Sequence, residues 1–118
     1  MEGVRPEPKS TSSSAAPRRA KAGTARGHHS VYVVFLRNPK GDGKAGYYVG
    51  MTGLTPEARF ANHKAGIKSA SVVRRYGVRL VPKLYEHLNP MPYDEAVRME
   101  VQLADELRAR GFQIFGGH

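Results

Sequence analysis

The sequence contains no cysteine and comparatively few acidic residues. Without cysteine it cannot form disulfide bonds, a zinc–thiolate site or a cysteine nucleophile, so any metal ion would have to bind oxygen or imidazole ligands. Its 10 acidic residues are outnumbered by 19 lysines and arginines, which gives a net charge of +9. This excess favours a polyanionic partner such as nucleic acid, although ribosome-bound proteins and proteins of membrane surfaces share it.

Long apolar runs are absent as well. No run approaches the roughly 20 residues that are needed to span a bilayer, and the N-terminus has no apolar core typical of a secretory signal. We therefore expect a soluble, cytoplasmic protein without membrane contact. Its 118 residues are enough for one domain and too few for two ordinary ones.

Residues 1–29 differ in composition from the rest of the chain. They are rich in Ser, Ala, Pro, Gly and Arg, and they contain no aromatic residue and no periodic apolar pattern. We expect a disordered basic tail over residues 1–29 and one folded domain over residues 30–118. The tail is interpreted as a solvated linker, with a basic arm that strengthens nucleic-acid binding and a transit peptide as the alternatives.

The first half of the domain has the pattern of a β-hairpin. Two β-branched and aromatic runs, residues 31–36 and 47–51, are separated by a long loop that contains Asn, Pro and several glycines. Residues 41–46 spell Gly-x-Gly-x-x-Gly, but a strand-like run follows where a dinucleotide site needs a helix. We interpret this segment as a flexible turn.

The second half alternates helices with short strands. Thr55-Pro56-Glu57 combines a hydroxyl cap, a proline at the first helical position and an acid in the first turn, and so predicts a helix that ends near Gly66. The remaining elements that we expect are a short helix over residues 69–76, an edge strand over 78–85 that contains Pro82, a long helix over 93–110 and a short strand over 112–115. This order predicts a small α+β domain with a mixed or mostly antiparallel sheet.

One carboxylate lies on the apolar face of the long helix. On a helical wheel Glu100 falls in the middle of a narrow stripe formed by Ala96, Leu103, Ala104 and Leu107. Burial of an unpaired charge is costly, so Glu100 either turns to solvent, pairs with an arginine or binds a metal ion. Because the chain has no cysteine and few acids, such a metal would be Mg²⁺ or Mn²⁺.

The helix that begins at Thr55 carries a possible phosphate site. Arg59 and His63 are four residues apart and share one face, where a guanidinium can match phosphate geometry and an imidazole titrates near neutral pH. Taken singly, each is more often a solvated surface residue. A basic flank that would suit a nucleic-acid backbone follows, and it includes Lys64, Lys68, Arg74 and Arg75.

Two tyrosines can meet across the hairpin. Because side chains alternate along a strand, Tyr32 lies on one face of the first strand, and Tyr48 and Gly50 share one face of the second. If the hairpin pairs those faces, Tyr32 and Tyr48 are neighbours, whereas Tyr47 points the other way. The long loop leaves the register open, and a tyrosine pair often serves core packing alone.

Taken in order, Val31-Tyr32, Tyr48-Val49-Gly50, Arg59 with His63, and then Glu100 resemble the GIY-YIG nuclease superfamily. The stretch YVGMTGLTPEARFANH, residues 48–63, is especially similar, and the resemblance covers nearly all of residues 30–117. It implies a small domain with a central three-stranded antiparallel or mixed sheet flanked by helices. It also implies cleavage of DNA phosphodiester bonds with one divalent metal ion, Mg²⁺ or Mn²⁺.

The resemblance assigns a role to each residue of the signature. Tyr32 would align or deprotonate the attacking water, and Tyr48 would bind the phosphate or order that water. Arg59 would stabilise charge on the phosphate, and a metal ion bound by Glu100 would stabilise the leaving oxygen. His63 would assist proton transfer.

The resemblance also implies a nucleic-acid surface beside the site. Gly50 would let the backbone turn closely beneath the site. The DNA contacts that we expect are Gly50, Lys64, Lys68, Arg74 and Arg75. Specificity would have to come from DNA shape, a homodimer or a partner protein, because the domain has little room for a separate recognition module.

The chain departs from the family pattern at two points. Ser30 stands at the first glycine of the GIY signature, and no asparagine follows the last helix, where Gln113 and His118 are the candidate substitutes. Two other functions stay open: a nucleic-acid-binding module of this type without catalysis, because folds can outlive their chemistry, and a small basic protein of a ribonucleoprotein particle.

Overall fold

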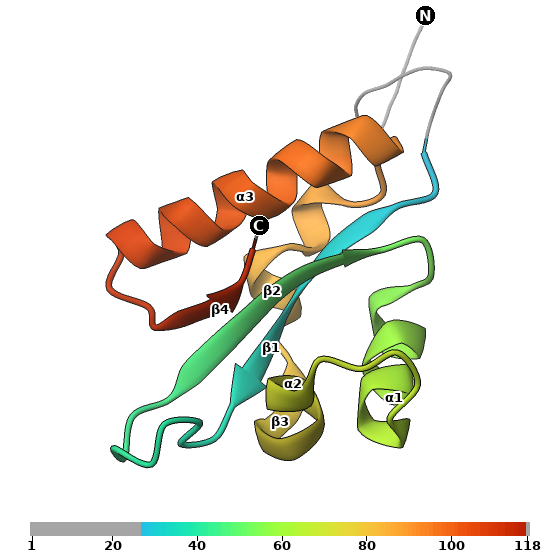
Figure 1. The fold of residues 1–118 in the computed structure, drawn as a ribbon. Coiled ribbons are helices and arrows are strands. Elements are labelled where there is room, and N and C mark those ends of the chain that lie inside the picture. The colour runs from blue at the N-terminus through green and yellow to red at the C-terminus, as the bar shows by residue number, and fades with distance from the viewer. Residues whose placement is uncertain (1–26, 118) are drawn as a thin grey trace, which may run out of the picture.

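The computed structural model describes residues 27–117, so the expected tail over residues 1–29 lies almost wholly outside the described residues. Within residues 27–117 the chain forms an α+β fold with one mixed four-stranded sheet and three α-helices (Figure 1). The strand order is β3-β1-β2-β4. His29, at the start of this part, exchanges backbone hydrogen bonds with Met91, and so the ordered pairing begins one residue before the expected boundary at 30.

The central hairpin has the predicted form. Strands β1 (Ser30–Leu36) and β2 (Gly46–Thr52) pair antiparallel, with Val33 opposite Val49. The long loop between them closes on itself, because Asn38 accepts hydrogen bonds from the backbone N–H groups of Gly41 and Gly43. Strand β2 follows this loop directly, as expected for a turn rather than a dinucleotide site.

The outer strands correct the expected three-stranded sheet. Strand β3 (Gly77–Leu80) pairs antiparallel with β1, and β4 (Ile114–Gly116) adds a fourth strand, parallel to β2. The expected strand over 78–85 is also too long, because Pro82 begins a 3₁₀ turn, η1 (Pro82–Leu84), that leads into η2 (Glu86–Leu88). Proline has no N–H for a strand ladder and its fixed φ suits the first helical position.

The three helices confirm the predicted positions to within about two residues. Helix α1 (Pro56–Ala65) begins where the Thr55 hydroxyl accepts the N–H of Ala58, and it ends at Gly66, whose φ is 82°. Helix α2 (Ser71–Tyr76) follows after a five-residue connection, residues 66–70. Helix α3 (Tyr93–Ala109) is the longest.

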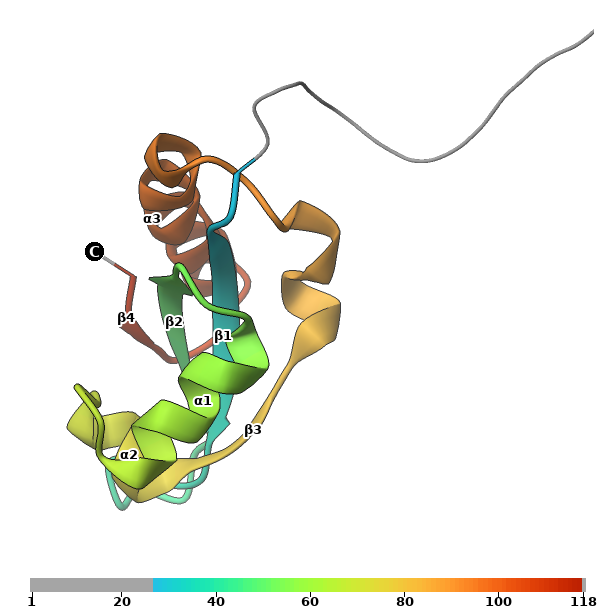
Figure 2. The ribbon, with the colours of Figure 1, turned by 90° about the vertical axis from the view of Figure 1, so that its right-hand side faces the viewer.

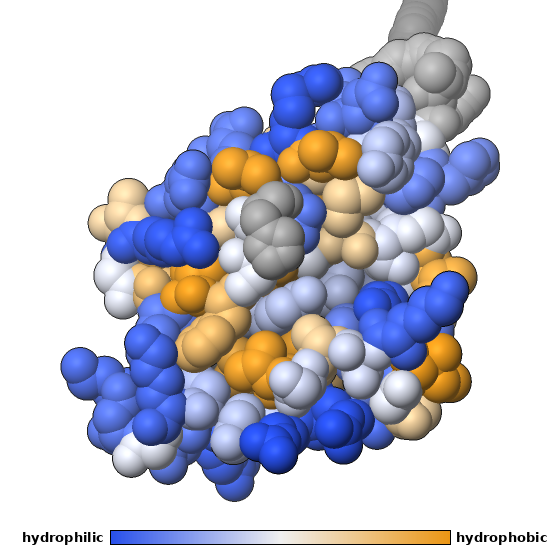
Figure 3. Space-filling model, in the orientation of Figure 1, coloured by the Kyte–Doolittle hydropathy of each residue, from blue (hydrophilic) through white to orange (hydrophobic). Residues whose placement is uncertain are grey.

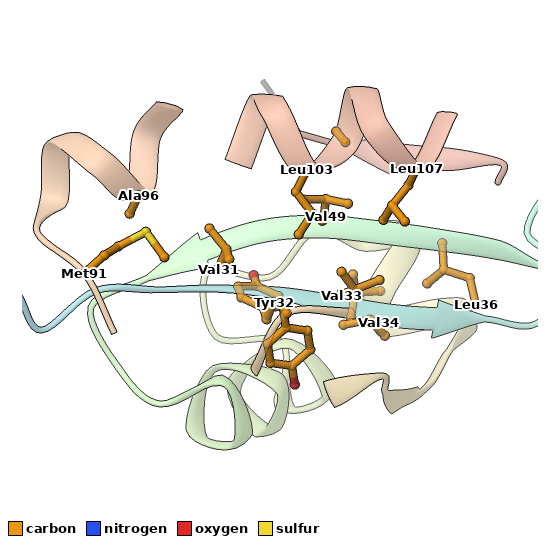
Figure 4. Close-up of a cluster of buried hydrophobic side chains, with 13 residues drawn as sticks. Val31, Tyr32, Val33, Val34, Leu36, Val49, Met91, Ala96, Leu103 and Leu107 are labelled. Carbon is orange, nitrogen blue, oxygen red and sulfur yellow. The ribbon is translucent and has the colours of Figure 1, made fainter. Parts of the chain in front are cut away.

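The sheet lies between two helical layers. Helix α3 covers one face, and α1 and α2 lie on the other (Figures 1 and 2). The close-up in Figure 4 shows Val49 beside Leu103 and Leu107 of α3, whereas Tyr32 points toward α1. Alternate side chains of β1 and β2 therefore supply both halves of the core, and the buried end of Tyr32 lies in the half beside α1.

The surface is hydrophilic around the rim of the face drawn in Figure 3, with apolar groups over α3. Val97 and Val101 of α3 are among the large apolar side chains that remain partly exposed. Within residues 27–117 no helix is long and apolar enough to cross a membrane.

Candidate active site

The register of the hairpin brings Tyr32 and Tyr48 together. Tyr32 lies opposite Gly50 and Val34 lies opposite Tyr48, so the two tyrosines are diagonal neighbours on one face of the sheet. Their ring centroids are 6.2 Å apart. Tyr32 is 1% exposed and Tyr48 is half-buried. The sequence allowed this pairing, and the structure confirms it.

Gly50 provides the space that the Tyr32 ring occupies. A Cβ atom at position 50 would lie 2.6 Å from Tyr32 Oη and 3.0 Å from Cε2 of Tyr48, closer than van der Waals contact permits. Gly50 itself is buried. Glycine at this position therefore lets the Tyr32 hydroxyl lie close to the backbone of β2, whereas the sequence predicted a DNA contact for Gly50.

His63 is fully buried next to the Tyr32 hydroxyl. Its Nε2 atom is 2.8 Å from Tyr32 Oη, and the backbone N–H of Ala70 donates to its Nδ1 atom at 3.0 Å. Burial, together with the positive charge of Arg59, lowers the pKa of His63 to about 4. The imidazole is thus neutral at neutral pH.

Arg59 is held by main-chain oxygens. Its two terminal nitrogens donate to the carbonyl groups of Ile67 at 3.2 Å and Lys68 at 2.7 Å, both in the connection between α1 and α2. The guanidinium also lies close enough to Tyr32 that its positive charge acts to lower the pKa of that phenol. The cation therefore has one fixed position beside the tyrosines.

Both tyrosines stay neutral at neutral pH. Burial, followed by the neighbouring Tyr48, raises the pKa of Tyr32 far above its ordinary value, even though Arg59 opposes the shift. Burial, followed by the negative charge of Glu100, raises the pKa of Tyr48. The site thus presents two phenol groups rather than phenolates.

Glu100 reaches the same cluster from α3. It is half-buried on the face of the helix that also carries the buried Ala96 and Ala104, as the helical wheel indicates. Its charge acts on Tyr48 and, more weakly, on Tyr32. The five residues that the sequence singled out therefore converge from β1, β2, α1 and α3: Tyr32, Tyr48, Arg59, His63 and Glu100.

The donor atoms suit one class of metal ion. Within residues 27–117 no group of three or more His, Cys, Asp or Glu side chains could hold a metal ion. A resident zinc site with three or four protein ligands is therefore a poor fit. Mg²⁺ is commonly bound by one or two carboxylates together with water and substrate phosphates, so a single Glu100 is compatible with Mg²⁺ or Mn²⁺.

The basic flank divides into two kinds of residue. Lys64 donates from Nζ to the carbonyl oxygens of Arg74 and Gly77, at 3.0 and 2.8 Å, and so closes the C-terminal end of α2. Lys68, Arg74 and Arg75 have exposed side chains. Lys64, one of the four DNA contacts expected in this flank, is therefore engaged in holding the C-terminal end of α2.

Gln113 and Tyr47 make their contacts outside the cluster. Gln113 donates to the carbonyl of Ala45 at the start of β2, and so it ties β4 to the hairpin instead of replacing the missing asparagine. His118 lies outside the described residues. Tyr47, on the other face, packs against the rings of Phe35 and Phe112 at 5.7 and 4.9 Å.

Two contributors escaped the sequence analysis. Ala70 acts through its backbone N–H, which no side-chain pattern reveals. Asn89 donates to the Val31 carbonyl at 2.8 Å and accepts the Val31 N–H at 2.9 Å, and so it fixes β1 next to Tyr32. The pair Asn89-Pro90 is typical of a turn, but it gives no indication of this long-range contact.

No family model, curated protein or solved structure matches the chain. The function of the protein is therefore inferred from the geometry of the cluster and from the resemblance of its sequence pattern.

Gly50→Ala should displace Tyr32, because the new methyl group would overlap the phenol. We expect a loss of about 1–3 kcal/mol in the free energy of unfolding, as is typical of overpacking. Gly53→Ala is the matched control, since its Cβ would meet nothing closer than 3.4 Å, at His29. Urea unfolding of both variants would measure the difference; equal stabilities would show that the Tyr32 ring can give way freely.

His63 should make folding sensitive to mild acid. The unfolded chain protonates this histidine near pH 6.5, whereas the folded state resists until about pH 4. Above pH 7 His63 is neutral in both states and does not change the free energy of unfolding. Between pH 6.5 and 4 the unfolded state binds the proton first, so the free energy of unfolding falls with a slope of up to about 1.4 kcal/mol per pH unit. Urea unfolding at several pH values should show that His63→Gln removes this loss; parallel curves for both proteins would contradict it.

Proposed function

We propose that this protein is a metal-dependent endonuclease that hydrolyses DNA phosphodiester bonds with Mg²⁺ or Mn²⁺. One observation carries the proposal: a fixed guanidinium, two neutral phenols and a carboxylate converge from four elements of the fold. Packing alone does not require this combination of groups. The order of the residues along the chain, with its resemblance to GIY-YIG nucleases, supports the same reaction.

Arg59 would bind the phosphate and stabilise the charge that develops on it. Arginine has five N–H donors, and only part of this fork is used on the carbonyls of Ile67 and Lys68. Because these contacts hold the guanidinium in place before substrate binds, little reorganisation is needed during the reaction.

The two phenols would position the attacking water and the phosphate. Tyr32 would align the attacking water, or take its proton while passing the phenol proton to a phosphate oxygen, and the positive charge of Arg59 would stabilise negative charge that develops on the phenol oxygen. Tyr48, which is only half-buried, would donate a hydrogen bond to a phosphate oxygen. Glu100 would hold the metal ion, which when bound would supply Lewis-acid stabilisation of the leaving oxygen.

The DNA backbone would lie along the exposed cations beside the site. Lys68, Arg74 and Arg75 are exposed near Arg59 in the chain, and the net charge of +9 favours a polyanion. Such a substrate agrees with an intracellular location. One site cuts one strand, so double-strand cleavage would need a second copy or a partner protein.

The second candidate is a nucleic-acid-binding module of the same type that has no catalytic activity. The exposed Lys68, Arg74 and Arg75 and the net charge of +9 support it, because they favour a polyanion whether or not the site is catalytic. The two candidates differ in what Glu100 does, because binding alone has no evident need for a carboxylate at this position.

Cleavage assays would separate these candidates. Purified protein would be incubated with branched, flapped, nicked and plain duplex DNA in Mg²⁺, Mn²⁺ or EDTA. We expect metal-dependent cleavage that Glu100→Gln abolishes and Arg59→Ala lowers by about 100-fold or more, while DNA binding by the Glu100 variant persists. Glu95→Gln, an exposed position on the same helix, is the control. Binding without cleavage of any substrate would leave only the module, and activity in EDTA would exclude the metal mechanism.

The two neighbouring tyrosines should respond differently to loss of the hydroxyl. Tyr48→Phe should reduce the cleavage rate, because Tyr48 lies on the face of the cluster. Tyr47→Phe should leave the rate unchanged, because the ring contacts with Phe35 and Phe112 do not use the hydroxyl. Single-turnover cleavage of one DNA substrate would compare them, and equal losses would remove Tyr48 from the site.

A further inference from the structure

We propose that His63 is a positioning residue that donates a hydrogen bond to Tyr32, and that it does not accept a proton during the reaction. This inference rests on the proposed function for its catalytic consequence, but its structural part can be tested without any cleavage. It also replaces the role in proton transfer that the sequence predicted for His63.

The backbone N–H of Ala70 determines which nitrogen of His63 carries the proton. An N–H group can only donate, so Nδ1, which lies 3.0 Å from the Ala70 nitrogen, must accept with its lone pair. A neutral imidazole with no proton on Nδ1 carries its proton on Nε2. Full burial favours this neutral form.

The Tyr32 hydroxyl must then accept from His63. The proton on Nε2 points at Tyr32 Oη, 2.8 Å away, so the tyrosine cannot donate to the same nitrogen. The positive charge of Arg59 also acts on this hydroxyl. Because a hydroxyl oxygen has two lone pairs and one proton, the Nε2 donor occupies one lone pair, and the Tyr32 proton and the other lone pair are left for groups other than His63.

This arrangement prepares Tyr32 for a reaction at the phosphate. The hydroxyl can accept a proton from the attacking water on its remaining lone pair while it passes its own proton to a phosphate oxygen, so one proton arrives as one leaves. The Nε2 donor of His63 stabilises the oxygen during this exchange. His63 keeps its Nε2 proton throughout. Proton exchange with Tyr32 therefore occurs on the substrate side and not through the histidine.

One short connection holds both His63 and Arg59. Residues 66–70 supply the Ala70 N–H that holds His63, and the Ile67 and Lys68 carbonyls that hold Arg59. The same connection is fastened to α1, because the N–H of Ile67 donates to the Asn62 carbonyl at 2.8 Å. The orientation of both side chains is thus set by main-chain groups of this connection.

Two amide variants distinguish a hydrogen-bond donor at position 63 from a proton acceptor at that position. In His63→Gln the side-chain amide nitrogen takes the approximate place of Nε2 and can still donate to Tyr32. In His63→Asn the amide reaches only the place of Nδ1, so it can accept from Ala70 but cannot reach Tyr32. Neither amide can act as a base at neutral pH.

For a positioning donor we expect kcat of His63→Gln to stay within about tenfold of wild type, whereas His63→Asn loses about 100-fold or more with little change in KM. Unfolding experiments on both variants would verify that each is folded under the assay conditions. Equal, large losses in both folded variants would show that His63 transfers a proton, and would overturn the proposal.

Nitrogen-15 NMR of the His63 ring tests the structural part directly. At pH 7 the wild-type protein should show a proton on Nε2 and none on Nδ1, with slow exchange of the Ala70 amide. A proton on Nδ1, or a doubly protonated ring, would overturn the inference. This result does not depend on cleavage, so a protein with the expected ring state and no nuclease activity would contradict the proposed function alone.

Discussion

The burial of one hydroxyl group, that of Tyr32, constrains the rest of the site. A phenol oxygen in the interior must find hydrogen-bond partners, and it needs room that a side chain at position 50 would take away. Gly50 supplies the room and His63 supplies a partner. Because His63 is itself fully buried, it needs a partner in turn, and the backbone of Ala70 provides it. A chain of obligatory contacts thus runs from the centre of the sheet to the connection between α1 and α2.

Charged groups approach this neutral core from two sides. Arg59 comes from α1 and Glu100 from α3, and their opposite charges act on the same tyrosine hydroxyls with opposite sign. The sheet makes this possible, because β1 and β2 carry both tyrosines on one face, within reach of both charges. The fold therefore places a cation and an anion around two polar, uncharged groups, an arrangement that suits a phosphate and its counter-ion better than it suits simple packing.

Local signals in the sequence predicted the helices and strands well. Contacts between residues that are distant in the chain were predicted less well. Thr55-Pro56-Glu57 and the wheel position of Glu100 depend on neighbouring residues, and both expectations agree with the structure. The short final strand expected over residues 112–115 lies at Ile114–Gly116, but its parallel pairing with β2 was not predicted, because that pairing depends on where α3 returns the chain. The support of His63 could not be predicted, because a backbone N–H is present at nearly every residue and gives no pattern of its own.

The connection between α1 and α2 holds Arg59 and His63 with peptide groups instead of side chains. The exposed side chains of Ile67 and Lys68 take no part in those hydrogen bonds, so they can be exchanged wherever the backbone path is kept, including the left-handed φ of 47° at Lys68. Ala70 is more constrained, because its side chain packs against the core. The number of residues is a different matter, because an insertion or deletion would move the carbonyls and the amide out of register with their partners. In this segment, natural variation should therefore be wide in residue identity and narrow in length.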